Sequence, residues 1–448
     1  MAKATPIFEC TACGQRSPKW LGRCPGCGGW NTLEQLPTEL RSRPTRSPTP
    51  AVSLADAELA DLPRESTGLP GVDRVLGGGL VPGSLVLLAG EPGVGKSTLL
   101  LQVAAAVARR GPVLYVTAEE SARQVALRAH RLAVVHPAVQ LLAESEVEAV
   151  VEAASRMRPA LVVVDSVQAT LSRRVPAVPG TVTQVREVAS QLAELAKRGG
   201  PPVILVGHVT KDGLVAGPKS LEHLVDVVLD FAGLASQCHR ALRSVKNRFG
   251  PTLELALFTM GDRGLEEVAS PSQVLLADRR PGAPGSAVAA VIEGTTPLLV
   301  EVQALLSRSS LATPRRVCQG MDSGRMAVLL AVLERHADVR LFDRDVFLNV
   351  VGGVAVDEPA LDLAAAAALL SSARERPLPD DLVCFGEVGL LGEVRAVSRA
   401  AERLREALAL GFTRCALPAT AMPATLDGFT THALAKVTDL EPLLRVLE

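Results

Sequence analysis

Short apolar runs alternate with amphipathic stretches along the middle of the chain, from about residue 62 to about residue 269. Four of these runs are rich in Val, Leu and Ile and predict buried strands: residues 84–89, 113–117, 161–164 and 203–208. Residues 98–107 predict a helix, because their apolar residues recur at the spacing of one helical face. Strands that alternate with helices predict an α/β domain built on a parallel sheet.

The pattern changes after about residue 269, at a joint rich in Pro, Gly and Arg over residues 279–285. The elements predicted beyond it are a strand over residues 346–351, a buried Ala-rich helix over residues 362–370 and an amphipathic helix over residues 398–410, which Gly411 closes. Single hydrophobic cores rarely exceed about 250–300 residues. A chain of 448 residues is therefore expected to contain more than one domain.

Charge and composition say little about partners. Lys and Arg number 47 against 48 Asp and Glu, so any contact with nucleic acid has to come from local patches. No apolar run approaches the roughly 18 residues of a membrane helix, and the N-terminus has no apolar signal core. We therefore expect a cytoplasmic protein without membrane association.

Four of the eight cysteines form two C-x-x-C pairs near the N-terminus, each followed by a glycine: Cys10 with Cys13 and Cys24 with Cys27. Four thiolates at this spacing predict a Zn²⁺ site, and the metal would supply most of the folding energy of so small a segment. The competing interpretation is a redox dithiol, which is typical of a single C-x-x-C beside a βαβ unit. For Trp20 and Trp30 in the same segment, contact with nucleic acid, packing and simple solvation are all compatible with the sequence.

The predicted strand and helix within residues 84–107 flank a string that fits G-x-x-x-x-G-K-[ST] at every fixed position: Gly90-Glu91-Pro92-Gly93-Val94-Gly95-Lys96-Ser97-Thr98. The glycines let backbone N–H groups point at phosphate oxygens, Lys96 supplies a positive charge, and Ser97 supplies a hydroxyl for Mg²⁺. The phosphates also meet the positive end of the helix dipole. All nine residues are therefore predicted to bind a nucleoside triphosphate, with ATP and Mg²⁺ as the expected cofactors.

Acidic residues leave two of the predicted strands next to this loop. Asp165 is assigned to Mg²⁺, and Glu119 is assigned to the water that attacks the γ-phosphate. The alternative is that these acids end strands only because loops are polar. His208, at the end of another predicted strand, is either a sensor of the γ-phosphate or a packed histidine.

Two basic loops follow strands of the same sheet: residues 171–183 with Arg173 and Arg174, and residues 209–220 with Lys211 and Lys219. In a ring of such domains these loops can grip a phosphate backbone. Surface solvation is the simpler explanation of the same lysines and arginines.

The string Lys246-Asn247-Arg248-Phe249-Gly250 carries two cations two residues apart. On a strand such residues point the same way, so Lys246 and Arg248 are predicted to project from one face as a cationic pair. A neighbouring subunit can insert such a pair to neutralise the charge that develops on a γ-phosphate. The string therefore predicts an oligomer with ATP sites between subunits.

The cysteine-rich segment, the phosphate loop and the strings at residues 115–121, 207–213 and 246–250 together resemble the RadA (Sms) family of bacterial DNA repair proteins. The resemblance runs in order along nearly the whole chain. It implies a RecA-like P-loop ATPase core behind an N-terminal zinc ribbon-like finger. It also implies a homo-hexameric ring, similar to DnaB-type helicases, that binds single-stranded and branched DNA, drives branch migration in homologous recombination after DNA damage and works with the recombinase RecA.

The C-terminal part resembles the peptidase domain of Lon, which RadA proteins also carry, at residues 301–305, 345–353 and 386–394. Lon-type peptidases use a serine nucleophile and a lysine base. The matching segment here is Glu358-Pro359-Ala360-Leu361-Asp362, without serine. Near the position expected for the lysine stands Arg399, which is too basic to act as a general base at neutral pH. We therefore expect an α+β Lon-protease-like domain that forms the ring and contacts DNA without cleaving peptides.

The expected organisation is a C4 zinc finger (residues 1–35), a basic Pro- and Ser-rich linker (residues 36–61), a RecA-like ATPase domain (residues 62–269) and the Lon-protease-like domain (residues 270–448). The expected function is a DNA-stimulated ATPase that moves as a ring along single-stranded DNA. An ATP-switched adaptor that binds DNA and a recombinase without motor activity is the alternative. The sequence hardly separates these two functions.

Overall fold

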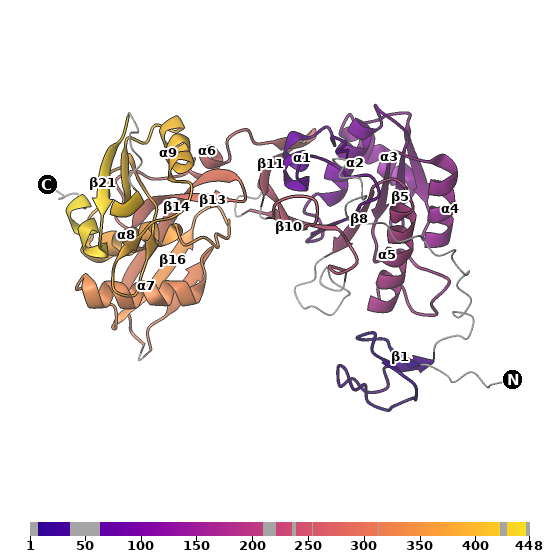
Figure 1. Ribbon diagram of the computed structural model, residues 1–448, viewed down its shortest axis with the longest axis horizontal. Helices are drawn as coiled ribbons and strands as arrows, with labels where there is room; N and C mark the ends of the chain where they lie inside the picture. The colour runs from indigo at the N-terminus through magenta and orange to yellow at the C-terminus, as the bar shows by residue number, and fades with distance from the viewer. Residues whose placement is uncertain are drawn as a thin grey trace, which may run out of the picture. The chain divides into compact units, whose positions relative to one another are not determined.

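The computed structural model describes residues 8–35, 63–208, 221–234, 239–252, 254–311, 313–421 and 428–444. Their contacts define two compact units (Figure 1). The first contains the described residues of Met1–Gly233 and Arg240–Glu267, and the second those of Leu234–His239 and Val268–Glu448. The main part of the second unit thus begins close to the change in sequence pattern near residue 269.

The N-terminal segment of the first unit is a small antiparallel ribbon. Its strands are β1 Phe8–Cys10, β2 Arg16–Ser17 and β3 Leu33–Gln35, in the order β2-β1-β3. The buried apolar cluster of the ribbon consists of Cys10, Cys24 and Leu33. So small a core needs another source of folding energy, which a metal ion can supply.

The rest of the first unit is built on a nine-stranded sheet with the order β12-β11-β10-β9-β4-β8-β7-β5-β6. The strands are β4 Leu85–Gly90, β5 Val113–Thr117, β6 Val139–Ala143, β7 Leu161–Asp165, β8 Val203–His208, β9 Val227–Gly233, β10 His239–Asn247, β11 Leu255–Gly261 and β12 Gly264–Glu267. The strands from β9 to β6 in this order are parallel, and β10 runs antiparallel to β9. The predicted α/β fold with a parallel sheet is confirmed, and each of the four predicted strands is present.

Helices cover both faces of this sheet: α1 Pro70–Leu76, α2 Lys96–Val107, α3 Ala122–Arg131, α4 Val147–Met157 and α5 Val182–Lys197. Alternate residues of β4 point to opposite faces, so Leu88 enters a core with α2, whereas Leu87 enters a core with α4 and α5. Burial on both faces explains why these strands form continuous apolar runs in the sequence. Polar side chains are therefore confined to the strand ends and the loops.

The second unit has a seven-stranded sheet with the order β15-β16-β14-β13-β17-β20-β21, and a separate pair of strands, β18 and β19. The strands are β13 Ser286–Glu293, β14 Thr296–Arg308, β15 Arg316–Gln319, β16 Arg344–Val350, β17 Leu382–Cys384, β18 Glu387–Val388, β19 Val394–Arg395, β20 Arg414–Pro418 and β21 Thr430–Leu434. The α-helices are α6 Pro271–Leu275, α7 Ser323–His336, α8 Leu361–Arg374 and α9 Ala400–Ala409, and Ala419–Ala421 and Val437–Leu443 form 3-10 turns.

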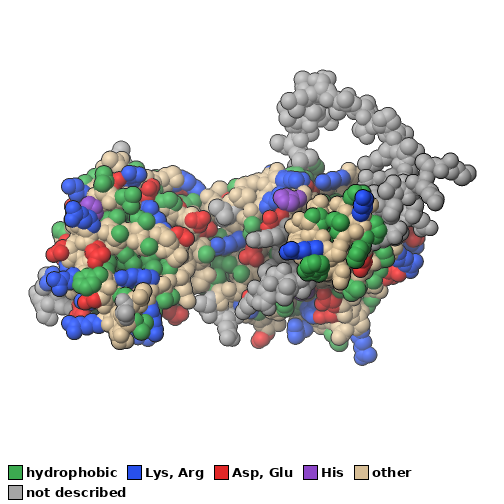
Figure 2. All heavy atoms as spheres, turned by 90° about the horizontal axis from the view of Figure 1, so that it is seen from below, with side chains coloured by type: hydrophobic (Ala, Val, Ile, Leu, Met, Phe, Trp, Pro, Cys, Tyr) green, Lys and Arg blue, Asp and Glu red, His purple; other side chains and the backbone are tan. Residues whose placement is uncertain are grey.

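Both helices predicted for this unit are present with shifted ends. The Ala-rich helix is α8, which extends beyond the predicted residues 362–370 and is buried through Ser371. The amphipathic helix is α9, which begins later than predicted because Arg399 has the left-handed conformation, with φ of 61°. No helix in the described ranges is long and apolar enough to cross a membrane. On the face shown in Figure 2, positive and negative side chains are interspersed, as the balanced composition predicts.

Candidate active site

The glycine-rich string forms the turn between β4 and α2, near the middle of the sheet (Figure 1). β4 ends at Gly90 and α2 begins at Lys96, so the N–H groups of the loop lie at a helix N-terminus, where anions bind. Gly95 caps the helix with φ of 114°, a conformation that favours glycine. At Gly90 a Cβ atom would meet the carbonyl oxygen of Phe231 at 2.2 Å. Glycine is therefore required at both positions, for different reasons.

Lys96 is only 4% exposed and folds back onto its own loop. Its Nζ donates hydrogen bonds to the carbonyl oxygens of Gly90 and Glu91 at 2.8 and 2.9 Å. Burial lowers the pKa of Lys96, whereas the negative charges of Asp165 and Glu119 raise it. The lysine of the loop thus lies within electrostatic reach of both predicted acids.

Glu119 and Glu120 follow β5 and have different partners. Glu120 pairs with Arg128 of α3 at 2.6 Å. Glu119 instead accepts a hydrogen bond from the Ser166 hydroxyl and lies 3.5 Å from Nε2 of His208. Because the side chain of Glu119 is 49% exposed, its carboxylate can also reach a water molecule. Of these two carboxylates, only Glu119 combines exposure with closeness to the lysine of the loop.

Asp165 ends β7, the strand next to β5. Its Oδ2 accepts a hydrogen bond from the hydroxyl of Tyr115 at 2.9 Å. Burial raises the pKa of Tyr115 well above its usual value, and the charge of Asp165 raises it further, so the hydroxyl keeps its proton and donates. Tyr115 is absent from the sequence prediction because, within an apolar strand, it is indistinguishable from a core residue.

Arg240, at the beginning of β10, is a second residue of the site that the sequence prediction lacks. Its Nε donates a hydrogen bond to the carbonyl oxygen of Val94 in the phosphate loop at 2.8 Å. The two residues are 146 positions apart in the chain, and only the sheet order β4-β9-β10 brings them together. Hydrophobic periodicity carries no information about such a contact.

Lys246 and Arg248 lie at the edge of the sheet opposite the phosphate loop. β9 runs parallel to β4 and β10 antiparallel to β9, so β10 begins near the loop and ends at Asn247, which pairs with Val227 at the far end of β9. The two ends of β10 lie roughly 25 Å apart. Neither cation can therefore reach the phosphate loop of its own subunit.

The pleat of β10 does not by itself align these two cations, which corrects the prediction from strand alternation. β10 ends before Arg248, and a register shift precedes Lys246. Instead, Nζ of Lys246 donates to the Val225 carbonyl oxygen at 2.9 Å, and Nη1 of Arg248 pairs with Asp226 at 3.0 Å. One turn therefore holds both cations on the same side.

The uncharged residues of the same string shape this edge of the sheet. Asn247 donates from Nδ2 to the Leu76 carbonyl oxygen at 3.1 Å and accepts at Oδ1 from the Phe249 N–H at 2.8 Å. Phe249 packs against the core that contains α2. A Cβ atom on Gly250 would lie 3.0 Å from Cα of Gly77, so only glycine fits there without a shift of the backbone.

The four cysteines of the ribbon converge on one point, since their Sγ atoms all lie within 4.8 Å of one another. Sulfur atoms of different motifs lie 3.6 Å apart in two pairs, Cys10 with Cys27 and Cys13 with Cys24. These pairs join different C-x-x-C motifs, which argues against a redox dithiol within one motif. Gly14 and Gly28 have φ of 72° and 74°, as the expected tight turns require. Four converging thiolates are a donor set that Zn²⁺ prefers.

The two tryptophans of the ribbon are surface residues rather than packing aromatics. Trp20 is 55% exposed and Trp30 is 71% exposed. The Arg23 guanidinium lies over the Trp30 ring, 5.9 Å from its centroid. Their exposure excludes packing in a core and leaves contact with nucleic acid and simple solvation as interpretations of the two rings.

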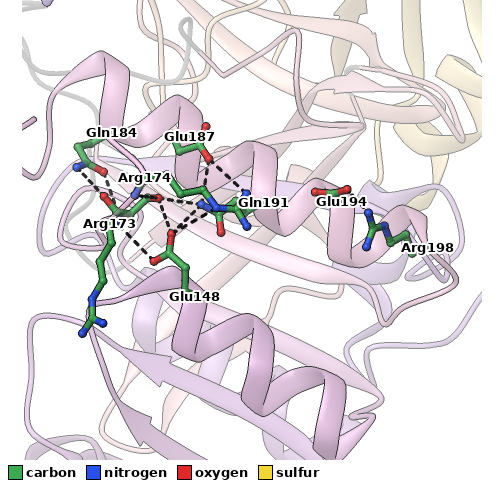
Figure 3. Close-up of polar contacts among 9 residues, drawn as sticks. Glu148, Arg173, Arg174, Gln184, Glu187, Gln191, Glu194 and Arg198 are labelled. Atoms are coloured by element: carbon green, nitrogen blue, oxygen red, sulfur yellow. Dashed lines mark hydrogen bonds and ion pairs between the residues drawn. The ribbon is translucent and has the colours of Figure 1, made fainter. Parts of the chain in front are cut away.

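The basic loop after β7 is tied to acidic side chains. Arg173 pairs with Glu146 at 2.5 Å, and Arg174 lies 4.0 Å from Glu148 and 3.8 Å from Glu187. Figure 3 shows Arg174 turned toward these carboxylates, whereas the Arg173 guanidinium points away from them. Both arginines are thus partly neutralised within their own subunit. Two cations predicted in the second basic loop lie outside the described residues: Lys211 and Lys219.

In the second unit, a partly buried ion pair occupies the segment compared with the nucleophile region of Lon. Glu358 accepts a hydrogen bond from the Ile292 N–H at 2.6 Å and pairs with the fully buried guanidinium of Arg403. Ala360, just before α8, is also fully buried. These contacts are structural and offer no nucleophile.

An arginine edge lies at one end of the second unit's sheet: Arg308, Arg315, Arg316 and Arg344. Arg308 lies directly opposite Arg344 across β14 and β16, an arrangement of like charges that destabilises a sheet. Two aspartates belong to the same edge: Asp345 lies near Arg315 and Arg316, and Asp343 directly precedes Arg344. The arginine edge therefore carries excess positive charge suited to an anionic partner.

The sheet, the phosphate loop with its two acids and the four-cysteine ribbon define a RecA-like P-loop ATPase that carries an N-terminal zinc ribbon. Residues 54–214 match the family model of the AAA domain, and residues 8–35 match that of the rubredoxin metal binding domain. Among solved structures, a KaiC-like protein from Pyrococcus horikoshii is 22% identical, covers 46% of this chain and 99% of its own, and has a TM-score of 0.39.

Curated relatives cover nearly the whole chain. DNA repair protein RadA of Pseudomonas aeruginosa is 49% identical over 93% of this chain and 94% of its own length. The RadA proteins of Bacillus subtilis and Escherichia coli are each 46% identical, over 96% and 98% of this chain and 95% and 98% of their own. The chain therefore belongs to the RadA family of DNA repair proteins, and it is an ATP-hydrolysing enzyme. The resemblance seen in the sequence motifs is confirmed.

Proposed function

We propose that this enzyme is a DNA-dependent ATPase of recombinational repair that acts as a homo-hexameric ring in the cytoplasm. The ring translocates on single-stranded DNA and drives branch migration of recombination intermediates, with the recombinase RecA as its expected partner. The relatives named above are DNA repair proteins, which supports the biological role. The geometry of the ATP site supports the oligomer.

The observation that carries the proposal is the position of Lys246 and Arg248. Both lie at the edge of the sheet opposite their own phosphate loop, at the far end of β10. A cationic pair that serves a γ-phosphate must therefore come from another subunit. Cations placed where charge develops in the transition state are among the strongest contributors to phosphoryl transfer. If each subunit receives the cations of one neighbour and offers its own to the next, the interfaces are head-to-tail, and such interfaces form a ring when the rotation between subunits closes.

The residues around the loop fit ATP with Mg²⁺. We assign the nine residues of the loop to the phosphates, Ser97 and Asp165 to the metal, and Glu119 to the attacking water. Mg²⁺ would neutralise charge on the phosphate oxygens. In the free protein, two hydrogen bonds to loop carbonyls stabilise the buried charge of Lys96. When ATP binds, Lys96 must exchange these bonds for bonds to phosphate oxygens. The four ribbon cysteines hold Zn²⁺ as a structural ion.

The arginine edge of the second unit supports DNA contact. Arg316 donates from Nη1 and Nη2 to the carbonyl oxygens of Arg344 and Leu341, so Arg308, Arg315 and Arg344 are the residues assigned to phosphate. One guanidinium can donate two hydrogen bonds to a phosphate group. Like charges that oppose each other at Arg308 and Arg344 cost stability in the free protein, and a polyanion relieves that cost. We assign this unit to DNA contact and ring formation without peptidase activity. Cleavage of casein by the pure protein would contradict the assignment.

One experiment separates a motor from an ATP-switched adaptor. ATPase rates are measured with and without single-stranded DNA, beside unwinding of a forked duplex whose two arms are labelled separately. A motor shows DNA-stimulated turnover and directional strand displacement, and Lys96→Ala abolishes both. An adaptor binds DNA in the presence of ATP but displaces neither arm.

A further inference from the structure

Asp226 is a buried carboxylate that joins two distant parts of the ATPase unit. Its side chain is 7% exposed. Oδ2 accepts a hydrogen bond from the Leu85 N–H at 3.0 Å, and Oδ1 pairs with Nη1 of Arg248 at 3.0 Å. Leu85 opens β4, the strand that ends in the phosphate loop. A single side chain thus ties Arg248 to the base of that strand.

The turn that leads into Asp226 also holds Lys246. Nζ of Lys246 donates to the carbonyl oxygens of Glu222 and Val225. The turn itself is firmly anchored, because Leu221 and Val225 are buried in the core with α4 and α5, and the Val225 N–H donates to the Leu221 carbonyl oxygen. Both cations therefore rest on a fixed part of the fold.

Each cation keeps hydrogen-bond donors for a ligand. A guanidinium has five N–H donors and an ammonium has three. Asp226 engages Nη1 of Arg248, whose side chain is 49% exposed, and the two carbonyls can engage two of the three protons of Lys246. The contacts with the turn thus orient both groups without using up their capacity to bind phosphate.

We propose that Asp226 is a positioning residue for catalysis in the neighbouring subunit: with the turn at residues 222–226, it presents Lys246 and Arg248 to the γ-phosphate bound next door. The inference rests on the proposed function, in which subunits share ATP sites. Long cationic side chains lose much conformational freedom when they bind. Holding them in place before the neighbour's ATP arrives removes that loss from the catalytic step.

The opposite role for Asp226 is sequestration, in which the ion pair keeps Arg248 away from the neighbour. The two roles predict changes of opposite sign. Asp226→Asn keeps the shape of the side chain, but one of its two oxygens becomes an NH₂ group. Because the Leu85 N–H and Arg248 approach different oxygens of Asp226, one of these two donors then faces another donor. Positioning predicts that kcat falls roughly 10²-fold with an unchanged KM for ATP. A faster ATPase than wild type would show sequestration and overturn the proposal.

Mixed rings of the full-length protein separate positioning from general damage. An Asp226→Asn subunit has an intact phosphate loop and misplaced cations, whereas a Lys96→Ala subunit has a defective loop and intact cations. Their mixture should regain ATPase activity, and a mixture of Asp226→Asn with Lys246→Ala should not. If Lys246→Ala and Lys96→Ala complement each other but Asp226→Asn and Lys96→Ala do not, Asp226 merely supports the fold and the proposal is wrong.

The controls distinguish this inference from the proposed function. If Lys246→Ala and Lys96→Ala fail to complement each other, the shared site itself is absent and both proposals fall. Glu152→Gln removes a negative charge from a side chain of α4 that is 76% exposed and lies outside the turn, so it should retain wild-type turnover. If Asp226→Asn does not fold, Asp226→Ser replaces it, because its shorter side chain removes the carboxylate that pairs with Arg248.

Discussion

Two neighbouring glutamates after β5 have the same chemistry and different surroundings. Glu120 is held by Arg128, whereas Glu119 contacts Ser166 and His208 and lies within electrostatic reach of Lys96. The sequence places both acids next to the loop, and only the partners of each side chain distinguish them. At the scale of single residues, the hydrogen-bond and ion-pair partners of each carboxylate thus decide which of the two is assigned to the attacking water.

Glu119→Gln is therefore expected to lower kcat by about 10²–10⁴-fold, the range for loss of a general base. Binding of ATP should change little, because the amide keeps the size of the side chain and Lys96 remains. Steady-state ATPase rates and equilibrium binding of a fluorescent ATP analogue measure the two effects. Glu120→Gln is the matched control and should retain most activity. Equal losses in both variants would contradict the assignment.

At the scale of elements, the sequence predicts β4, β5, β7 and β8 well because burial on both faces makes them continuous apolar runs. Contacts across strands are not encoded in that periodicity. Arg240 contacts the phosphate loop only because the sheet order brings β10 near β4. Arg248 lies beyond the end of β10, so strand alternation cannot explain why it lies on the same side as Lys246. The family resemblance includes Arg248 but not Arg240, and only the sheet topology shows at which edge of the sheet each of them lies.

The ribbon makes a prediction of its own at this scale. Because its apolar core is so small, Cys24→Ala should abolish zinc binding and unfold the ribbon, while the separate nine-stranded sheet keeps its cooperative thermal unfolding. Zinc content by elemental analysis should fall from about one ion per chain to near zero. Cys318→Ser, outside the ribbon, is the control and should keep its zinc. A wild-type protein purified without chelator that holds no zinc would refute the site.

At the scale of the whole molecule, each of the two units has a feature that calls for a partner outside the single chain. The ATPase unit carries a phosphate loop at one edge of its sheet and the cations expected to serve such a loop at the other. The segment of the second unit that was compared with Lon, residues 358–362, contains no serine, and the unit carries an arginine edge. The proposed assembly with further copies and with DNA accounts for both features.

The double variant Arg308→Ala with Arg344→Ala should bind single-stranded DNA more weakly. Each lost phosphate contact should also reduce the slope of log affinity against log salt by about 0.7. Fluorescence anisotropy with a labelled oligonucleotide at several salt concentrations measures both changes. Arg405→Ala, an exposed arginine on α9, is the control for lost charge. An unchanged salt dependence in the double variant would rule out the arginine edge as a DNA contact.

The most direct test of the central claim, an ATP site shared between subunits, is the ATPase rate of mixtures of Lys96→Ala and Lys246→Ala proteins. Each variant alone should be inactive. In an equimolar random ring about one interface in four joins an intact loop to intact cations. The mixture should therefore regain up to about a quarter of the wild-type rate. Mixtures that assemble into common rings and stay inactive at every ratio would contradict the account.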